Sequence, residues 1–174
     1  MTSVLRAAEL PVSRWPNGAG RKADLLTGDG WMIGFAWLDA DAPFSVLPEM
    51  DRTITLVQGP GFTLDVAGKA LPVELVFEPI RFDGGAITTC RIIGPSRVLN
   101  VMTARGRFHH RVEIVEQLGP IALGALAGMA VVLDGAAICA GVPLGCLDAV
   151  HLDETTALDL ASGSLIAVIT IDRV

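Results

Sequence analysis

Short apolar runs alternate with breaks rich in Gly and Pro along the whole chain. The clearest run is residues 53–58 (TITLVQ), where β-branched and apolar residues alternate with polar ones after Pro48. Alternation with a period of two is typical of a strand that buries one face. The break at residues 59–61 (GPG) predicts a tight turn, after which residues 62–66 return as a second strand, so that the two strands form a hairpin.

The same criteria predict further strands at a spacing typical of an all-β protein, with breaks every eight to twelve residues or so. These predicted strands are residues 31–38, 71–77, 86–93, 97–102, 149–160 and 164–171. Residues 13–22 (SRWPNGAGRK) differ, because Pro and Gly interrupt them, and they predict a structured loop rather than a helix or strand.

The last third of the chain repeats the rhythm of the first. Residues 130–135 (AVVLDG) resemble residues 55–59 (TLVQG), and Gly and Pro follow each at similar distances. An ordered similarity of this kind indicates duplication of a β unit. The second copy has few polar groups beyond acidic turn residues, so we interpret it as scaffold rather than site.

Composition restricts the class of function. Apolar residues make up 51% of the 174 residues and charged residues 18%, which indicates a globular protein. The net charge of −6 and the absence of a Lys/Arg run argue against a nucleic-acid partner. No secretory signal or uninterrupted transmembrane run is present. We therefore expect a cytoplasmic protein that binds a small molecule or a protein, a second copy of itself included.

Cysteines and histidines do not form a metal-ligand pattern. Cys90, Cys139 and Cys146 lie in apolar surroundings and are predicted to be reduced core residues, with a Cys139–Cys146 disulfide as the alternative. His109 and His110 are adjacent, so on a strand they point to opposite faces and do not share a metal. We predict no metal site and no cofactor.

Two places predict accessible side chains. Arg52 follows Asp51 where a loop enters the strand at residues 53–58, and such junctions commonly expose functional groups. The loop at residues 13–22 is either a simple turn or a binding loop. In the second case Trp15 offers a flat wall and Asn17 an amide.

Four segments carry a resemblance to a known family. They are RWPNGAG, APFSVLPEMDRTITLVQGPGFTL, RFDGG and GPSRVLNVMTARG, which occur in this order over about residues 10–110. Together they resemble the HutD/Ves family, a cupin-fold family associated with histidine utilisation. Closed barrels also remove unpaired sheet edges, which favours the same architecture.

The resemblance implies an all-β, cupin-type (RmlC-like) β-barrel that is duplicated into two fused barrels. Residues 1–110 form an N-terminal cupin-like barrel with the pocket. Residues 111–174 form a smaller second barrel half, packed on the first as one compact unit. Six positions depart from the family pattern: Ala19, Lys22, Met32, Gly34, Glu49 and Val98. Several of these changes alter polar groups near the expected pocket, so the identity of the ligand stays open.

Comparison with metal-binding cupins singles out Arg52. Those cupins place a Glu seven residues before a strand-ending Gly, and Arg52 holds this position relative to Gly59. No His occurs at residues 45–48, near the place of the two His ligands. A cation in place of a metal ligand favours an anion, and a guanidinium can hold a carboxylate through two parallel hydrogen bonds. The predicted ligand-binding residues are Trp15, Asn17, Ser45, Arg52 and Asn100.

Three functions follow as hypotheses. The preferred one is a metal-free, cupin-like binding or regulatory protein for a small organic anion, such as a histidine-degradation intermediate. The alternative is a metal-independent isomerase or lyase for a small carboxylate, with Asp51 or His109 as base and Arg52 as clamp. The third is partner binding through an exposed sheet face. As a structural alternative, Arg52 pairs with Asp51 or another acidic side chain and only pins a loop.

Overall fold

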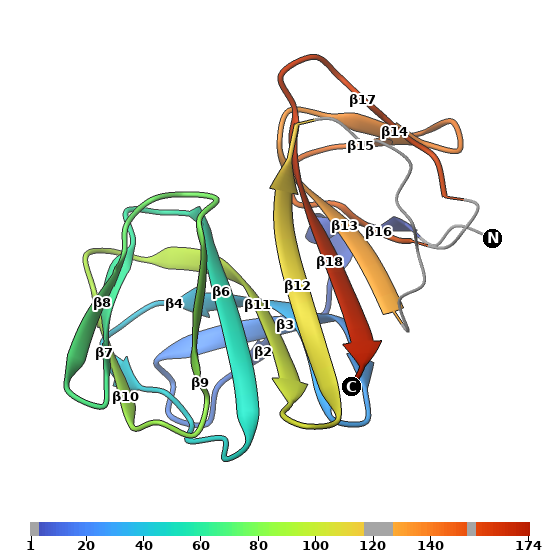
Figure 1. The fold of residues 1–174 in the computed structure, drawn as a ribbon. Helices are drawn as coiled ribbons and strands as arrows, with labels where there is room; N and C mark the ends of the chain where they lie inside the picture. Colours follow the sequence, from blue (N-terminus) through green and yellow to red (C-terminus); the bar gives the residue numbers. More distant parts are fainter. Residues whose placement is uncertain (1–3, 117–126, 153–155) are drawn as a thin grey trace. The chain divides into compact units, whose positions relative to one another are not determined.

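The computed structural model describes residues 4–116, 127–152 and 156–174, and nearly all of its regular structure is β-strand (Figure 1). The predicted all-β class is confirmed. In these ranges the helical structure is a single 3₁₀ turn, Ala7–Glu9. No helix here has the length and apolar character needed to cross a membrane.

The chain divides into two units, one of residues 11–109 and one that joins residues 4–10 to the part after residue 109. The first unit contains a six-stranded sheet in the order β2-β3-β4-β11-β6-β9 and a four-stranded sheet in the order β5-β10-β7-β8. The strands of the larger sheet are β2 Ser13–Arg14, β3 Gly20–Gly28, β4 Trp31–Leu38, β6 Met50–Gln58, β9 Pro79–Asp83 and β11 Ser96–Ala104. Those of the smaller sheet are β5 Ala42–Pro43, β7 Phe62–Val66, β8 Lys69–Val73 and β10 Thr88–Ile92.

The second unit contains a five-stranded sheet in the order β1-β16-β13-β18-β12 and a three-stranded sheet in the order β15-β14-β17. Its larger sheet consists of β1 Val4–Leu5, β12 Phe108–Val115, β13 Ala127–Asp134, β16 Ala149–His151 and β18 Leu165–Arg173. Its smaller sheet consists of β14 Ala137–Cys139, β15 Val142–Leu144 and β17 Leu158–Leu160. Asp148 ties residues 4–10 into this unit, since its carboxylate accepts hydrogen bonds from the Ala7 amide at 2.9 Å and from Arg6 Nη1 at 2.7 Å.

The two sheets of each unit pack face to face around an apolar core. In residues 11–109 the core joins Ile54 and Val98 of the larger sheet to Phe62 and Leu64 of the smaller one, and Figure 1 shows the two sheets on opposite sides. In the other unit, Ala130 and Ile166 of the larger sheet share a core with Cys139 of the smaller sheet. No sheet closes on itself among the described strands, so the predicted closed barrels are pairs of open facing sheets.

Strand pairing repeats from one unit to the other. β6 pairs with β9 and β11, and β7 pairs with β8 and β10. β13 likewise pairs with β16 and β18, and β14 pairs with β15 and β17. The sequence similarity between residues 55–59 and 130–135 falls on the equivalent strands β6 and β13.

The hairpins β7–β8 and β14–β15 have loops of the same two-residue sequence, Ala-Gly. Val66 pairs with Lys69 and Cys139 pairs with Val142, so two residues form each loop. These are Ala67-Gly68 and Ala140-Gly141, and all four have positive φ, with Ala67 at 50° and Ala140 at 49°. Two consecutive positive φ angles define a type I′ turn, whose first position prefers Asn to Ala.

Replacing Ala67 with Asn should therefore stabilise the protein by about 0.5–1 kcal/mol, because Asn adopts this conformation at a lower cost than Ala. Chemical denaturation of the single variant measures the change. Ala70→Asn is the matched control, since Ala70 is also exposed but lies in strand β8, where Asn is disfavoured. Equal stabilisation by both substitutions would contradict the turn explanation.

Four predictions need correction. The predicted hairpin of residues 53–66 is wrong, because β6 and β7 belong to different sheets and do not pair with each other. The predicted loop at residues 13–22 is partly strand: Ser13 and Arg14 pair with Lys22 and Arg21, Pro16 and Gly18 lie in the turn between β2 and β3, and Gly20 starts β3. The predicted strand at residues 71–77 ends at Val73, and Phe77 has a φ of 65°, which ends extended structure. The predicted strand at residues 149–160 is two strands, because β16 pairs with β13 whereas β17 pairs with β14.

The cysteines are free, as predicted, but only two of them are core residues. Cys90 and Cys139 are buried, and burial raises the pKa of the Cys90 thiol to about 12. Cys146 is exposed, and its Sγ donates to the Leu133 carbonyl at 3.2 Å. On β12, His109 is exposed and His110 is buried, which confirms that they point to opposite faces.

Candidate functional site

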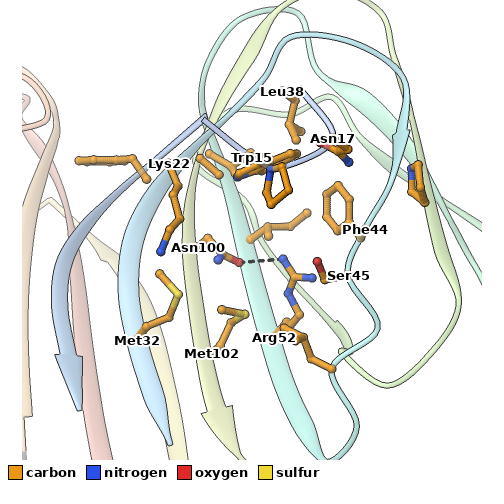
Figure 2. Close-up of a pocket in the computed structure, with 17 residues that line it drawn as sticks. Trp15, Asn17, Lys22, Met32, Leu38, Phe44, Ser45, Arg52, Asn100 and Met102 are labelled. Carbon is orange, nitrogen blue, oxygen red and sulfur yellow. Dashed lines mark hydrogen bonds between the residues drawn. The ribbon is translucent and has the colours of Figure 1, made fainter. Parts of the chain in front are cut away.

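A cavity of about 430 Å³ lies inside the unit of residues 11–109 (Figure 2), a size typical of small-molecule sites. All five side chains predicted to bind a ligand line it: Trp15, Asn17, Ser45, Arg52 and Asn100. Their function in binding stays a prediction. The other lining residues are mostly apolar: Pro16, Lys22, Met32, Phe35, Ala36, Leu38, Pro43, Phe44, Leu47, Ile54, Val98 and Met102.

The alternation of side chains along the strands of the larger sheet directs the polar residues toward the cavity. Arg52 and Ile54 on β6, and Asn100 and Met102 on β11, reach the cavity because every second residue of a strand points to the same face. Asn100 pairs with Ile54, and Met102 pairs with Arg52. Rigid neighbouring strands therefore hold Arg52 and Asn100 side by side.

Arg52 is a buried cation in contact with Asn100 and two aromatic rings. It is 9% exposed, and its Nη2 donates to Asn100 Oδ1 at 3.3 Å. The guanidinium carbon lies 5.0 Å from the ring centres of both Phe44 and Phe82, a distance typical of cation–π contacts. Burial lowers the pKa of Arg52 to about 10, so the side chain stays protonated at neutral pH.

The proposed Asp51–Arg52 pair is wrong. Asp51 Oδ1 instead accepts hydrogen bonds from Arg105, at 2.7 Å from Nη2 and 3.0 Å from Nε. Arg105 Nη2 also reaches Asp83 Oδ1 at 3.0 Å. A hydrogen bond from the Gly85 amide and then the contact with Arg105 hold the pKa of Asp83 below its usual range. In the part of the chain that the structure describes, no carboxylate forms an ion pair with Arg52.

The neutral polar side chains that line the cavity have mainly hydrogen-bond donors available for a ligand. Asn17 Oδ1 accepts from the Ala19 amide at 3.1 Å, and Asn100 Oδ1 accepts from Arg52, so each side chain retains its Nδ2 hydrogens. Ser45 lies beside the guanidinium of Arg52 in Figure 2. This arrangement suits a ligand whose polar end accepts hydrogen bonds.

Sequence reasoning missed the residues that hold Arg52 in place. Phe82 and Gly84 belong to the RFDGG segment, which contributes only to the family resemblance. A Cβ on Gly84 would lie 2.8 Å from the Met50 carbonyl oxygen and 3.1 Å from Arg52 Cδ, so Gly84 leaves room for the arginine stem. Phe44 belongs to the APFS part of the second segment. The signal available in the sequence was Phe44 itself, an aromatic residue in the same segment as the candidate cation Arg52.

The cavity does not fit a transition metal or a simple acid–base mechanism. Its lining contains no His, Cys, Asp or Glu, the usual ligands of zinc and related metals. No group of three such side chains comes together anywhere among the described residues. Asp51 and His109, the candidate bases, are not among the lining residues.

The two pairs of facing sheets define a cupin-like all-β fold, and the unit of residues 11–109 contains the cavity. A cupin barrel-domain protein from Leptotrichia buccalis superposes with a TM-score of 0.65 at 10% identity, covering 99% of this chain and 96% of that one. Likeness at this identity shows the fold alone.

The chain belongs to the HutD family, whose model matches residues 7–168. HutD from Pseudomonas fluorescens SBW25 superposes with a TM-score of 0.85, at 25% identity over 100% of both chains. The resemblance inferred from the four sequence segments is thereby confirmed.

Two sequence relatives support the same assignment. An uncharacterised protein from the hutC 3′ region of Pseudomonas putida is 30% identical over 118 residues, 63% of this chain and 62% of that protein. The match thus spans less than two thirds of that relative. Protein Ves of Citrobacter koseri is 26% identical over 136 residues, 74% of this chain and 71% of that protein.

Proposed function

We propose that this protein is a metal-free binding or regulatory protein that holds a small organic anion at Arg52. The observation that carries the proposal is a buried guanidinium that faces a cavity and has no ion-pair partner among the described residues. A buried charge without a counter-charge is costly, and an anionic ligand supplies that counter-charge.

The contacts of Arg52 indicate how an anion binds. Nε is buried and makes no hydrogen bond, Nη2 makes only the 3.3 Å bond to Asn100, and Nη1 makes none within the described residues. The carboxylate therefore accepts from Nη1 and Nη2 at the end of the guanidinium, in the two-bond geometry typical of such pairs. Asn100 Nδ2 supplies a further donor, and Trp15 and Phe44 cover the apolar part of the ligand.

The family points to a source for this anion. The name of the Pseudomonas putida relative places its gene beside hutC. A carboxylate intermediate of histidine degradation has the charge and size that this cavity accepts. We propose this class of ligand and a role in sensing or sequestering it.

We also propose that the two units arose by duplication and that only the first kept a binding site. Gly59 and Gly135 follow the equivalent strands β6 and β13, so the position of Arg52 corresponds to Gly128. Ile54 pairs with Asn100 as Ala130 pairs with Val168, and Val168 therefore stands at the position of Asn100. The repeated strand pairing supports the duplication, and the two apolar replacements support a scaffold function for the second unit.

A ligand screen tests the proposal. Small carboxylates such as propionate, butyrate and benzoate should raise the melting temperature of the wild-type protein, and the rise should disappear in Arg52→Met. Arg91→Met is the matched control, because Arg91 is exposed on β10 and does not line the cavity, and it should respond like wild type. If carboxylates stabilise Arg52→Met as much as the wild type, the proposal is wrong.

A further inference from the structure

We propose that Lys22 forms a second anion subsite in the same cavity, so that the preferred ligand carries two acidic groups. This inference rests on the proposed anion site at Arg52. The cavity lining contains two cations, Arg52 and Lys22, and no carboxylate, although the whole chain has a net charge of −6. A concentration of positive charge at one site of an acidic protein favours an anion with more than one charge.

Lys22 and Arg52 lie on the same sheet but on well-separated strands. The sheet order β3-β4-β11-β6 places the strand of Lys22 three strands away from that of Arg52. Figure 2 shows Asn100, on the intervening β11, between the two side chains. A ligand held by Arg52 therefore extends toward Lys22 across Asn100.

The strand register sets the distance that the ligand spans. Lys22 pairs with Ala36 and Ala36 with Val98, whereas Arg52 pairs with Met102, four residues further along β11. Ordinary strand spacings then separate the two Cα atoms by roughly 20 Å. Both side chains are long and line the same cavity, so one ligand can contact both charged groups. Two carboxylates joined by a short carbon chain suit such a pair of cations.

The wall between the two cations suits the middle of such a ligand. Ala36, Val98 and Ile54 are apolar, and all three line the cavity. Asn100 is the polar side chain on the intervening β11. The ligand thus has an anionic group at each end and a short, mainly apolar spacer.

Lys22 retains a donor for a ligand. Its Nζ donates to both oxygens of Asp24, at 2.9 Å and 3.1 Å, and an ammonium group has a third hydrogen. The pair is exposed, with 45% of the Lys22 side chain and 40% of the Asp24 side chain accessible, and exposed pairs are weak. Asp24 is not a lining residue, so it restrains Lys22 without occupying the cavity.

Calorimetric titration with glutarate and butyrate tests the second subsite, because the two differ in whether the far end is a carboxylate. At low salt, the wild type should bind glutarate about threefold to fivefold more tightly than butyrate, the range expected for one exposed ion pair. Lys22→Gln should reduce this ratio to about one without changing butyrate affinity. Asp24→Asn should increase the ratio, because it releases Lys22 from its partner.

Lys69→Gln is the matched control, since Lys69 is exposed on β8 outside the cavity, and it should keep the wild-type ratio. If butyrate and glutarate bind equally to the wild type, and Arg52→Met abolishes both, the Lys22 subsite is wrong and the anion site stands. An unchanged ratio in Lys22→Gln leads to the same conclusion. If neither compound binds the wild type, both proposals are overturned.

Discussion

Gly61→Ala is expected to lower the free energy of unfolding by about 3 kcal/mol or more, because two independent costs add. Gly61 has a φ of 95°, a conformation that disfavours any side chain. A Cβ at this position would also collide with the Val73 carbonyl oxygen and lie 3.0 Å from the Glu74 Cα atom. Both neighbours are backbone atoms, so the collision cannot be relieved by a rotamer change. Chemical denaturation measures the loss.

Hydrogen bonds prevent the Gly61 backbone from moving away. Its amide donates to Ser96 Oγ at 3.0 Å, and its carbonyl accepts from the Ile93 amide at 3.0 Å. Ser96 is itself 3% exposed, so a shift of Gly61 would leave buried polar groups without partners. The connection between β6 and β7 is thus fixed to the start of β11.

Gly68→Ala separates the two costs. Gly68 has a similar φ of 85°, but a Cβ there would have no heavy atom within 4 Å. This variant should lose only the conformational part, about 1 kcal/mol. If Gly61→Ala loses no more than Gly68→Ala, the collision with Val73 does not limit the turn.

Local alternation predicted most strands of the first unit. The pattern at residues 53–58 identified β6 because one face of that strand is buried, and the Gly-Pro-Gly break identified the turn. Residues 13–14 were missed because a two-residue strand next to Pro16 has too few positions to show a period. Residues 149–160 have alternating apolar positions, but the partners of β16 and β17 lie in different sheets, and local periodicity does not encode pairing partners.

Arg52 was predicted from the sequence because its position could be counted from Gly59 on a single strand. Its surroundings could not be derived in this way. Phe44, Phe82 and Gly84 come from separate segments, and only the facing sheets bring them to the guanidinium. The neighbouring Asp51 was misleading for a physical reason. Successive residues of a strand point to opposite faces, so Asp51 turns away from the cavity and binds Arg105.

Arg52→Met should separate ligand binding from stability. Loss of two charge-assisted hydrogen bonds is expected to weaken carboxylate binding about 100-fold or more. The free energy of unfolding should stay unchanged or rise by about 1 kcal/mol, because burying the charge costs about 3 kcal/mol and the contacts with Phe44, Phe82 and Asn100 offset only part of this. An arginine that pins a loop through a buried ion pair behaves oppositely, since its removal costs about 3–5 kcal/mol.

The pH dependence provides a second check on the same variant. Burial lowers the pKa of Arg52 to about 10 in the folded protein, below its value in the unfolded chain. The cost of the buried charge is therefore fully present below pH 10 and is relieved only as the pH rises above it. The stability difference between Arg52→Met and wild type should be constant from pH 6 to pH 9 in denaturation experiments. A difference that changes within this range, or a variant several kcal/mol less stable than wild type, would show that Arg52 serves the fold rather than a ligand.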